Sequence, residues 1–154
     1  MPTTNHDDDE KEKLEDEISE ILHQQERGQV NIRVMGDFNS IVGEGSTDKV
    51  VGLFGLCRRN ETGKMLIDFC KQHDLVVMNT WFKKRKTKLY TWKSPGHKNR
   101  YQIDYILVKQ RLRNTIRNVK TLPGADIDRY HNLLVAEVQT RLKAIKKAGK
   151  RKPK

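Results

Sequence analysis

Apolar positions recur along the chain with the spacings of two helices and several short strands. Residues 11–27 and residues 63–73 place apolar side chains one helical turn apart, so each segment predicts a helix with one buried face. Thr62 precedes the second segment and is its expected N-cap. The glycine-rich segment 43–55 predicts a long loop. Apolar or alternating runs predict strands at residues 32–35, 75–78, 89–92, 102–108, 115–122 and 133–138.

Helices and strands mixed along one chain indicate an α/β protein in which helices pack on a sheet. The 154 residues are enough for one domain, which we expect to span residues 11–140 with two helices and about five or six strands. A disordered acidic lead is expected at residues 1–10 and a basic tail at residues 141–154. That tail holds eight Lys and Arg residues and no acid, a pattern typical of nucleic-acid binding, of a nuclear import signal or of simple solubilisation.

The composition restricts the compartment and the class of protein. No apolar run approaches the roughly 20 residues that span a bilayer, and the acidic start of the chain is unlike a secretory signal, so no membrane partner is expected. Two cysteines, Cys57 and Cys70, make neither a disulfide framework nor a zinc site, and both are expected in the core. We therefore expect an intracellular protein, nuclear or cytoplasmic.

Charge is distributed unevenly, and the distribution indicates a polyanionic partner. Residues 1–26 carry a net charge of −8, whereas residues 27–154 carry a net charge of +19. Residues 75–103 contain no acid, and eight Lys and Arg residues gather there around three aromatic residues, Trp81, Tyr90 and Trp92. Basic side chains interleaved with aromatic rings suit phosphate contacts together with stacking on bases or sugars, so nucleic acid is the expected partner. A solvated basic face is the alternative.

Polar residues that could carry chemistry stand at the ends of three predicted strands. Asp37 and Asn39 follow the first strand, and oxygen ligands of this kind suit Mg²⁺ or the orientation of an attacking water. Taken alone, an Asp and an Asn after a strand are more often turn-formers. Asp104 interrupts an apolar run, and a carboxylate near a core needs a partner to offset its burial. His131 precedes the last strand and is the candidate partner, because an Asp–His pair fixes the imidazole tautomer.

Four motifs follow one another along the chain: GDFN at residues 36–39, YTW at 90–92, QIDYILV at 102–108 and GAD-x-x-x-x-H ending at His131. In their order and spacing these motifs resemble the endonuclease/exonuclease/phosphatase family, which includes deoxyribonuclease I-like enzymes and AP endonucleases. The resemblance spans roughly residues 14–143, and no single motif in it is specific, whereas the ordered set is. The similarity points to the retrotransposon-encoded branch and its host-carried descendants, such as craniofacial development protein 2-like and bucentaur-type proteins.

The resemblance implies a partial αββα sandwich, related to enzymes that hydrolyse phosphodiesters with a divalent metal, usually Mg²⁺. Asp37 would activate the attacking water or protonate the leaving group, and Asn39 would orient the nucleophile, so these two are the candidate metal ligands. Asp104 would support His131, which would contact the scissile phosphate. The residues implied to contact DNA are Tyr90, Thr91, Trp92, Lys98 and Arg100.

Two departures from the family pattern indicate weak or lost catalysis. Tyr130 stands before His131 where the family has an Asp, and a neutral phenol supplies no anionic oxygen at neutral pH. The half of the family's domain that supplies one sheet and the metal-binding Glu has no counterpart before Ile32. A missing sheet would leave an apolar face open to a second copy or a protein partner.

The expected function is therefore nucleic-acid binding, DNA first, with impaired hydrolysis. Whether the chain is an enzyme stays open at this point. The alternatives are an active endonuclease completed by dimerisation and a non-catalytic protein-interaction or chromatin module.

Overall fold

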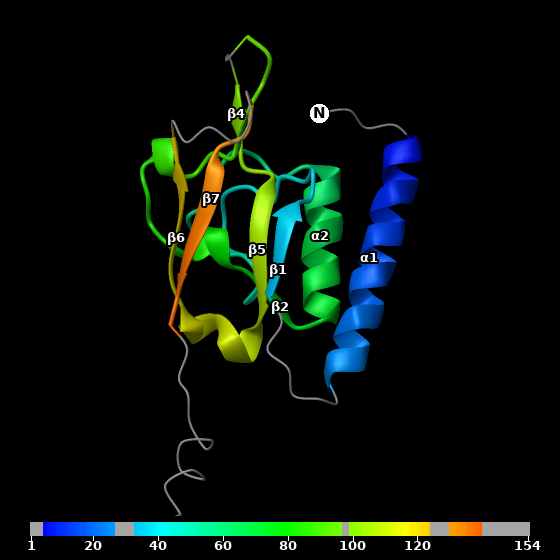
Figure 1. Ribbon diagram of the computed structural model, residues 1–154. Helices are drawn as coiled ribbons and strands as arrows, with labels where there is room; N and C mark the ends of the chain where they lie inside the picture. Colours follow the sequence, from blue (N-terminus) through cyan, green and yellow to red (C-terminus); the bar gives the residue numbers. More distant parts are fainter. Residues whose placement is uncertain (1–4, 27–32, 97–98, 124–129, 140–154) are drawn as a thin grey trace, which may run out of the picture.

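The computed structural model describes residues 5–26, 33–96, 99–123 and 130–139 (Figure 1). Two α-helices lie within these residues, α1 (Asn5–Glu26) and α2 (Glu61–Gln72). Three short 3₁₀ helices accompany them: η1 (Met78–Trp81), η2 (Lys86–Lys88) and η3 (Gln110–Thr115). The strands are β1 (Arg33–Asp37), β2 (Leu75–Val77), β3 (Trp92–Lys93), β4 (Arg100–Tyr101), β5 (Asp104–Lys109), β6 (Ile116–Leu122) and β7 (Leu133–Val138).

A three-stranded antiparallel sheet with the order β1-β5-β2 forms the centre of the fold. β5 lies in the middle because the four residues between Asp104 and Lys109 are apolar, and all four are buried. The register pairs Asp37 with Asp104, so both aspartates stand at the same end of neighbouring strands. β6 and β7 form a second antiparallel sheet, and β3 pairs with β4.

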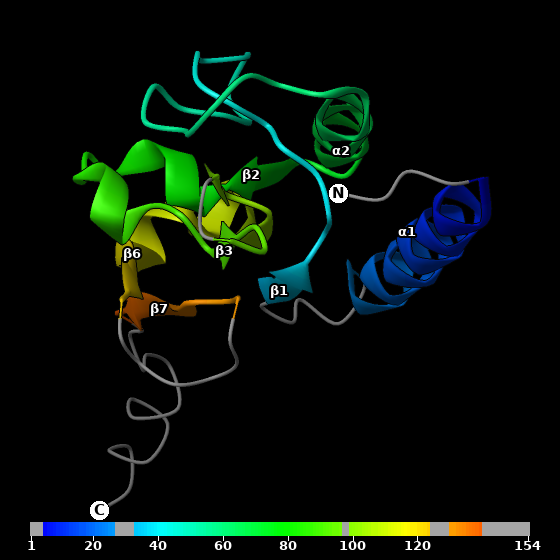
Figure 2. The same cartoon turned by 90° about the horizontal axis from the view of Figure 1, so that it is seen from above.

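The elements stack as one helix layer followed by two sheet layers (Figures 1 and 2). One core lies between the helices and the central sheet and includes Leu66 of α2 and Leu107 of β5. The other core lies between the opposite face of this sheet and the β6–β7 pair, and it includes Ile106 of β5 and Val119 of β6. Because neighbouring residues of β5 face opposite sides, one strand supplies both cores. The expected α/β class is confirmed, and the three layers follow the order α, β, β.

The helix α2 follows the long loop after β1, and its N-cap is Asn60 rather than the expected Thr62. The side-chain oxygen of Asn60 accepts hydrogen bonds from the backbone N–H groups of Gly63 at 2.8 Å and Ile41 at 3.1 Å. The hydroxyl of Thr62 also donates to this oxygen, at 3.0 Å. The Asn60 carboxamide thus caps the helix and fixes the preceding loop at the same time.

The helix α1 begins at Asn5, inside the segment that we expected to be an acidic lead. Residues 5–26 contain neither Gly nor Pro, so nothing in the sequence interrupts the helix there. Its C-terminal half is tied to the body, since Leu22 is buried in the helix-side core and Ser19 Oγ lies 2.8 Å from His73 Nε2. The part of the chain that the structure describes contains no helix long and apolar enough to cross a membrane.

Other elements differ from the expectations in detail. The predicted strand 89–92 is reduced to β3, because Leu89 and Tyr90 form part of a buried loop after η2. Cys70 is buried as expected, whereas Cys57 is only half-buried and lies in the loop with a φ of 70°. The long glycine-rich loop is confirmed, since residues 38–60 contain no helix or strand. The expected basic tail lies outside the described residues.

Candidate active site

Three polar residues from distant parts of the sequence meet at one end of the central sheet. Asp37 ends β1 and Asp104 begins β5, and the antiparallel register places them directly opposite each other. His131 arrives from the segment before β7, which forms a bridge with Trp92 of β3. Two backbone hydrogen bonds fix this bridge, from Asn132 N–H to the Thr91 carbonyl at 2.9 Å and from Lys93 N–H to the Tyr130 carbonyl at 2.8 Å.

The imidazole of His131 faces both carboxylates. Its Nε2 lies 3.4 Å from Oδ2 of Asp37 and 3.7 Å from Oδ2 of Asp104. The side chains are graded in exposure, from 17% for Asp104 through 27% for His131 to 43% for Asp37. We call Asp37, Asp104 and His131 the Asp-Asp-His cluster. It is closed on the Asp104 side and open to solvent on the Asp37 side.

Asn39, the fourth residue predicted for this site, is placed by a tight turn. Its backbone N–H donates to Oδ1 of Asp37 at 2.8 Å, and its φ of 51° lies in the left-handed region that Asn tolerates better than most residues. The turn holds one carboxylate oxygen of Asp37 and leaves the other directed at His131. Asn39 is therefore adjacent to the Asp-Asp-His cluster.

Asp104 is held by two residues to which the sequence assigned no such role, since Asn79 was not singled out and Thr91 was implied to contact DNA. The hydroxyl of Thr91 accepts a hydrogen bond from the Asp104 N–H at 3.1 Å. The amide of Asn79 donates to the Asp104 carbonyl at 3.0 Å and accepts from the Ile106 N–H at 2.9 Å. Thr91 and Asn79 are both buried, so they fix the backbone from which the carboxylate projects.

The residues implied to contact DNA fall into two groups. Thr91 is fully buried, and its hydroxyl accepts hydrogen bonds from two backbone N–H groups, so its side chain positions β5 in this structure. Trp92 is partly exposed and stacks on Tyr101 with ring centroids 5.7 Å apart. Arg100 is exposed and lies over the ring of Tyr90 at 5.3 Å. Lys98 lies outside the described residues.

Two tyrosines near the site, Tyr90 and Tyr130, differ in burial and in their surroundings. Tyr90 is buried at its ring, and a hydrogen bond with the Asn132 side chain lowers the pKa of its phenol from the ordinary value. Tyr130, at the position where the resemblance expects an Asp, is half-buried next to His131 in the chain. The described part of the site therefore contains two carboxylates, Asp37 and Asp104.

The donor atoms of the Asp-Asp-His cluster meet the requirements of a divalent cation in part. One atom from each residue lies within 4.8 Å of the other two. Mg²⁺ is commonly held by one or two carboxylates, and water and substrate phosphates complete its shell at about 2.1 Å. Two carboxylates satisfy this requirement, whereas an imidazole nitrogen is the ligand that zinc and other transition metals prefer.

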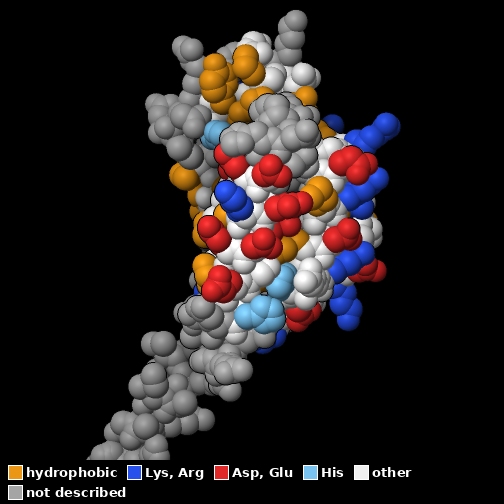
Figure 3. Space-filling view, turned by 90° about the vertical axis from the view of Figure 1, so that its right-hand side faces the viewer, with side chains coloured by type: hydrophobic (Ala, Val, Ile, Leu, Met, Phe, Trp, Pro, Cys, Tyr) orange, Lys and Arg blue, Asp and Glu red, His pale blue; other side chains and the backbone are white. Residues whose placement is uncertain are grey.

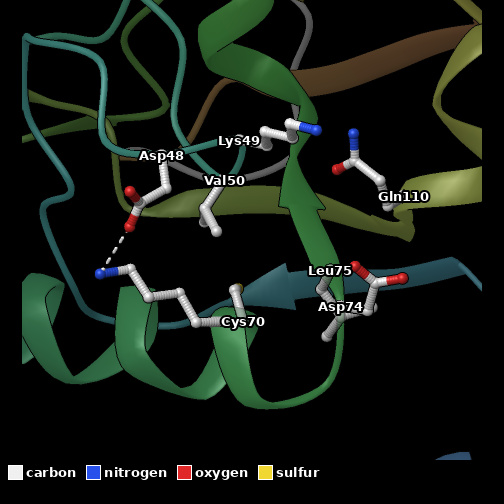
Figure 4. Close-up of a pocket in the computed structure, with 8 residues that line it drawn as sticks. Asp48, Lys49, Val50, Cys70, Asp74, Leu75 and Gln110 are labelled. Carbon is white, nitrogen blue, oxygen red and sulfur yellow. Dashed lines mark ion pairs between the residues drawn. The ribbon is translucent and has the colours of Figure 1, made fainter.

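A surface pocket lies at the opposite end of the central sheet, where β2 begins (Figure 4). Charged residues of both signs line it, including the ion pair between Lys71 and Asp48 at 2.8 Å. The thiol of Cys70 reaches its wall, but burial raises the pKa of this thiol well above the ordinary value. The pocket is thus separate from the Asp-Asp-His cluster and holds no nucleophile that is ready to react.

Comparisons with known proteins place the chain beside one group. It is 45% identical over 114 residues to craniofacial development protein 2 of Tragulus javanicus and 44% identical over 114 residues to the protein of that name from Bos taurus. The matched region covers 74% of this chain but only 20% and 19% of those two proteins, so the chain spans about a fifth of their length. No protein-family profile matches the chain. The expected similarity to craniofacial development protein 2 is confirmed for this segment.

Proposed function

We propose that this chain is a nucleic-acid-binding domain of the endonuclease/exonuclease/phosphatase type, derived from a retrotransposon, in which phosphodiester hydrolysis is weak or lost. The observation that carries the proposal is the assembly of Asp37, Asp104 and His131 within 4.8 Å. These residues are 67 and 27 positions apart along the chain, so the fold alone brings them together. Their meeting agrees with the order of motifs that the resemblance rests on.

The surroundings of the cluster support a polyanionic ligand. Trp92, whose backbone bridges to His131, and Tyr101 form an aromatic stack beside the cluster, and Lys93 and Arg100 are neighbours of these rings in β3 and β4. Arg100 is exposed and Lys93 is partly exposed. Cations next to stacked rings suit a phosphate backbone with its sugars or bases. In this arrangement Lys93 and Arg100 would hold phosphates while Trp92 would contact a sugar or base. DNA is the proposed partner, in the nucleus or the cytoplasm.

The cluster assigns separate tasks to its members. Asp37 and Asp104 would hold Mg²⁺, which when bound neutralises charge on phosphate oxygens and lowers the pKa of a bound water. His131 would then donate to a phosphate oxygen, oriented by its position between two carboxylates. Asn39 would help to orient the water next to Asp37.

We expect weak hydrolysis because Tyr130 replaces the acidic residue that the resemblance expects before His131. Tyr130 offers a phenol where the resemblance expects a carboxylate, and two carboxylates leave the cation with fewer anionic ligands. Loss of a metal ligand or general base typically lowers kcat by about 2–4 orders of magnitude. Binding does not depend on that residue, because phosphate contacts come from cations.

Fluorescence anisotropy with a labelled DNA duplex tests the binding part of this proposal. We expect the affinity to fall steeply with salt, and Arg100→Ala to weaken binding about threefold to tenfold while reducing the slope of log K against log salt by about one. Lys64→Ala is the matched control, because Lys64 is an exposed lysine on α2, on the far side of the central sheet. Binding that ignores salt, or a loss as large in the control, would refute the proposal.

Plasmid nicking with Mg²⁺ tests the catalytic part. We expect nicking at or close to background for the unaltered chain. Nicking that is robust and disappears in Asp37→Ala would show that hydrolysis is intact, which would favour the active endonuclease over the impaired one. Recovery of a stoichiometric protein partner after nuclease treatment, with no DNA binding, would instead favour a protein-interaction module.

A further inference from the structure

We propose that β1 pairs edge to edge, in antiparallel orientation, with β1 of a second copy of this chain. The pairing would place Arg33 of each copy beside Asp37 of the partner subunit. It would thereby add a guanidinium to the Asp-Asp-His cluster that no residue of the same copy supplies there within the described part of the chain. The pairing itself rests on β1 alone, and only its consequence for catalysis rests on the proposed function.

The strand β1 is an open edge of the central sheet. It pairs with β5 on one side, and among the described residues no strand pairs with its other side. Met35 in its middle is 60% exposed, and Gly36 and Asp37 are exposed as well. Figures 1 and 2 agree, with β1 at the margin of the sheet.

The backbone groups of alternate residues in β1 point toward this open side. Phe38 N–H donates to the Ile103 carbonyl, so residues 38 and 103 form a hydrogen-bonded pair. Hydrogen-bonded and non-hydrogen-bonded pairs alternate along an antiparallel ladder. Asp37 with Asp104 and Met35 with Ile106 are therefore non-hydrogen-bonded pairs. The N–H groups of Asp104 and Ile106 accordingly point away from β1, toward Thr91 and Asn79.

It follows that Arg33, Met35 and Asp37 direct their N–H and C=O groups away from β5. A row of backbone donors and acceptors at a sheet edge is a template for another strand. A second β1 matches this row when the antiparallel pairing is centred on Met35, because the same three residues of each copy then lie opposite each other. The backbone groups of Met35 meet those of Met35 of the partner subunit, and those of Arg33 meet those of Asp37 of the partner subunit.

The side chains favour this register over others. Residues paired across an antiparallel ladder share a face, so opposite charges stand directly across from each other at both ends of the pairing. The guanidinium of Arg33 is held only weakly within its own copy. Among the described residues its Nη2 makes a long bond of 3.4 Å to Thr115 Oγ1, and its Nε is buried without a hydrogen-bond partner, so the guanidinium must turn outward to meet a carboxylate of the partner subunit. A second copy of the chain is therefore the occupant that the charges select.

Charge exchange between two variants tests the register. Arg33→Glu puts like charges across from each other at both ends of the pairing, and so does Asp37→Lys. A mixture of the two variants restores opposite charges at both ends. We expect sedimentation velocity between about 1 and about 200 µM, at about 0.15 M salt, to show self-association of the unaltered chain, monomers of each variant alone, and association of the 1:1 mixture.

An unaltered chain that stays monomeric throughout this range would overturn the proposal. So would single variants that associate as well as the unaltered chain, or a mixture that stays monomeric although both variants retain the circular dichroism of the unaltered chain. None of these readouts involves nucleic acid or cleavage, so their failure is distinct from failure of the proposed function.

Cross-linking provides a second test that leaves the charges in place. In the proposed register position 35 meets itself with Cα atoms about 5.5 Å apart, within the range for a disulfide. We expect Met35→Cys to form a covalent dimer on mild oxidation. Leu53→Cys is the control, because Leu53 is similarly exposed, at 66%, but lies in the loop away from β1. Equal cross-linking of the two variants, or none of Met35→Cys, would contradict the pairing.

Discussion

At the scale of single residues, the hydroxyl of Tyr105 joins the central strand to the loop above it. It donates to the Gln102 carbonyl at 2.6 Å and accepts from the Val42 N–H at 3.0 Å. Tyr105 is fully buried, and this burial raises the pKa of its phenol well above the ordinary value, so it stays neutral at every working pH. The loop that contains Val42 leads directly from Asp37, so this hydroxyl stabilises the geometry of the site.

Replacement of this one hydroxyl should destabilise the protein. Tyr105→Phe leaves a buried N–H and a buried C=O without their partner, and we expect the free energy of unfolding to fall by about 1–3 kcal/mol. Urea denaturation followed by circular dichroism measures it. Tyr101→Phe is the control, since the ring of Tyr101 stacks on Trp92 and is partly exposed, and its change should stay below about 0.5 kcal/mol. Equal losses in the two variants would contradict the assigned network.

Some residues of the candidate site could be predicted from the sequence, and others could not. Asp37 and Asp104 stand out because each is a carboxylate at the end of an apolar run, where burial demands a chemical reason. Asn79 and Thr91 act through tertiary hydrogen bonds to β5, which no local pattern encodes. Asn79 shows only that a polar residue follows an apolar stretch, and Thr91 stands in the YTW motif, which was assigned to DNA contact and not to the support of Asp104. The association of His131 with Asp104, proposed as a candidate pair, depends on the bridge between Trp92 and His131, a contact between distant segments.

At the scale of elements, the start of α2 packs so tightly on the preceding loop that only glycine fits. A Cβ on Gly63 would lie 1.9 Å from the Ile41 carbonyl oxygen, a backbone atom that cannot move aside cheaply. The same loop is fixed by the hydrogen bond between the Ile41 N–H and Asn60. The helix and the loop therefore form one unit, which covers the helix-side core.

This tight contact gives a prediction whose sign opposes helix propensity. Alanine within a helix is favoured over glycine by about 1 kcal/mol, so propensity alone would make Gly63→Ala stabilising. We expect instead a loss of about 2 kcal/mol or more, because the loop must shift. Gly36→Ala is the control, since its Cβ would meet no atom within 4 Å. Thermal unfolding of the two variants checks this, and a Gly63→Ala variant as stable as the unaltered chain would disprove the contact.

Elements with a strong internal pattern were predicted well, and those that depend on a partner were not. The helix α2 and the central strand β5 carry their own apolar periodicity, and both were found close to the expected residues. β3 was expected to be longer, but its length is set by the two residues that pair with β4. The early start of α1 escaped prediction because its first two turns are polar, and polar turns of a helix carry no apolar periodicity.

At the scale of the whole molecule, charge is separated between two sides. Exposed acids follow α1, including Asp9, Glu12 and Asp16, and Figure 3 shows carboxylates gathered over the face of the molecule that α1 occupies. Exposed cations such as Arg100 lie near the candidate site. A polyanion approaching the molecule is therefore attracted at one side and repelled at another. This separation of charge favours the orientation in which DNA faces the cations near the candidate site. The acids of α1 at the same time lower the total attraction between the protein and DNA.

Neutralising the acidic helix should therefore strengthen DNA binding without touching the binding surface. For a variant carrying Asp9→Asn, Glu12→Gln and Asp16→Asn, we expect the affinity to rise about twofold to fivefold at about 0.05 M salt. The gain should vanish at about 0.5 M salt, because the Debye length then falls to about 4 Å and exposed charges on another face no longer affect the bound DNA. Fluorescence anisotropy at both salt concentrations measures the effect, and circular dichroism checks that the helix is retained. A gain that persists at high salt would mean that α1 contacts the DNA directly, and the absence of any gain at low salt would show that the charge separation does not reach the binding site.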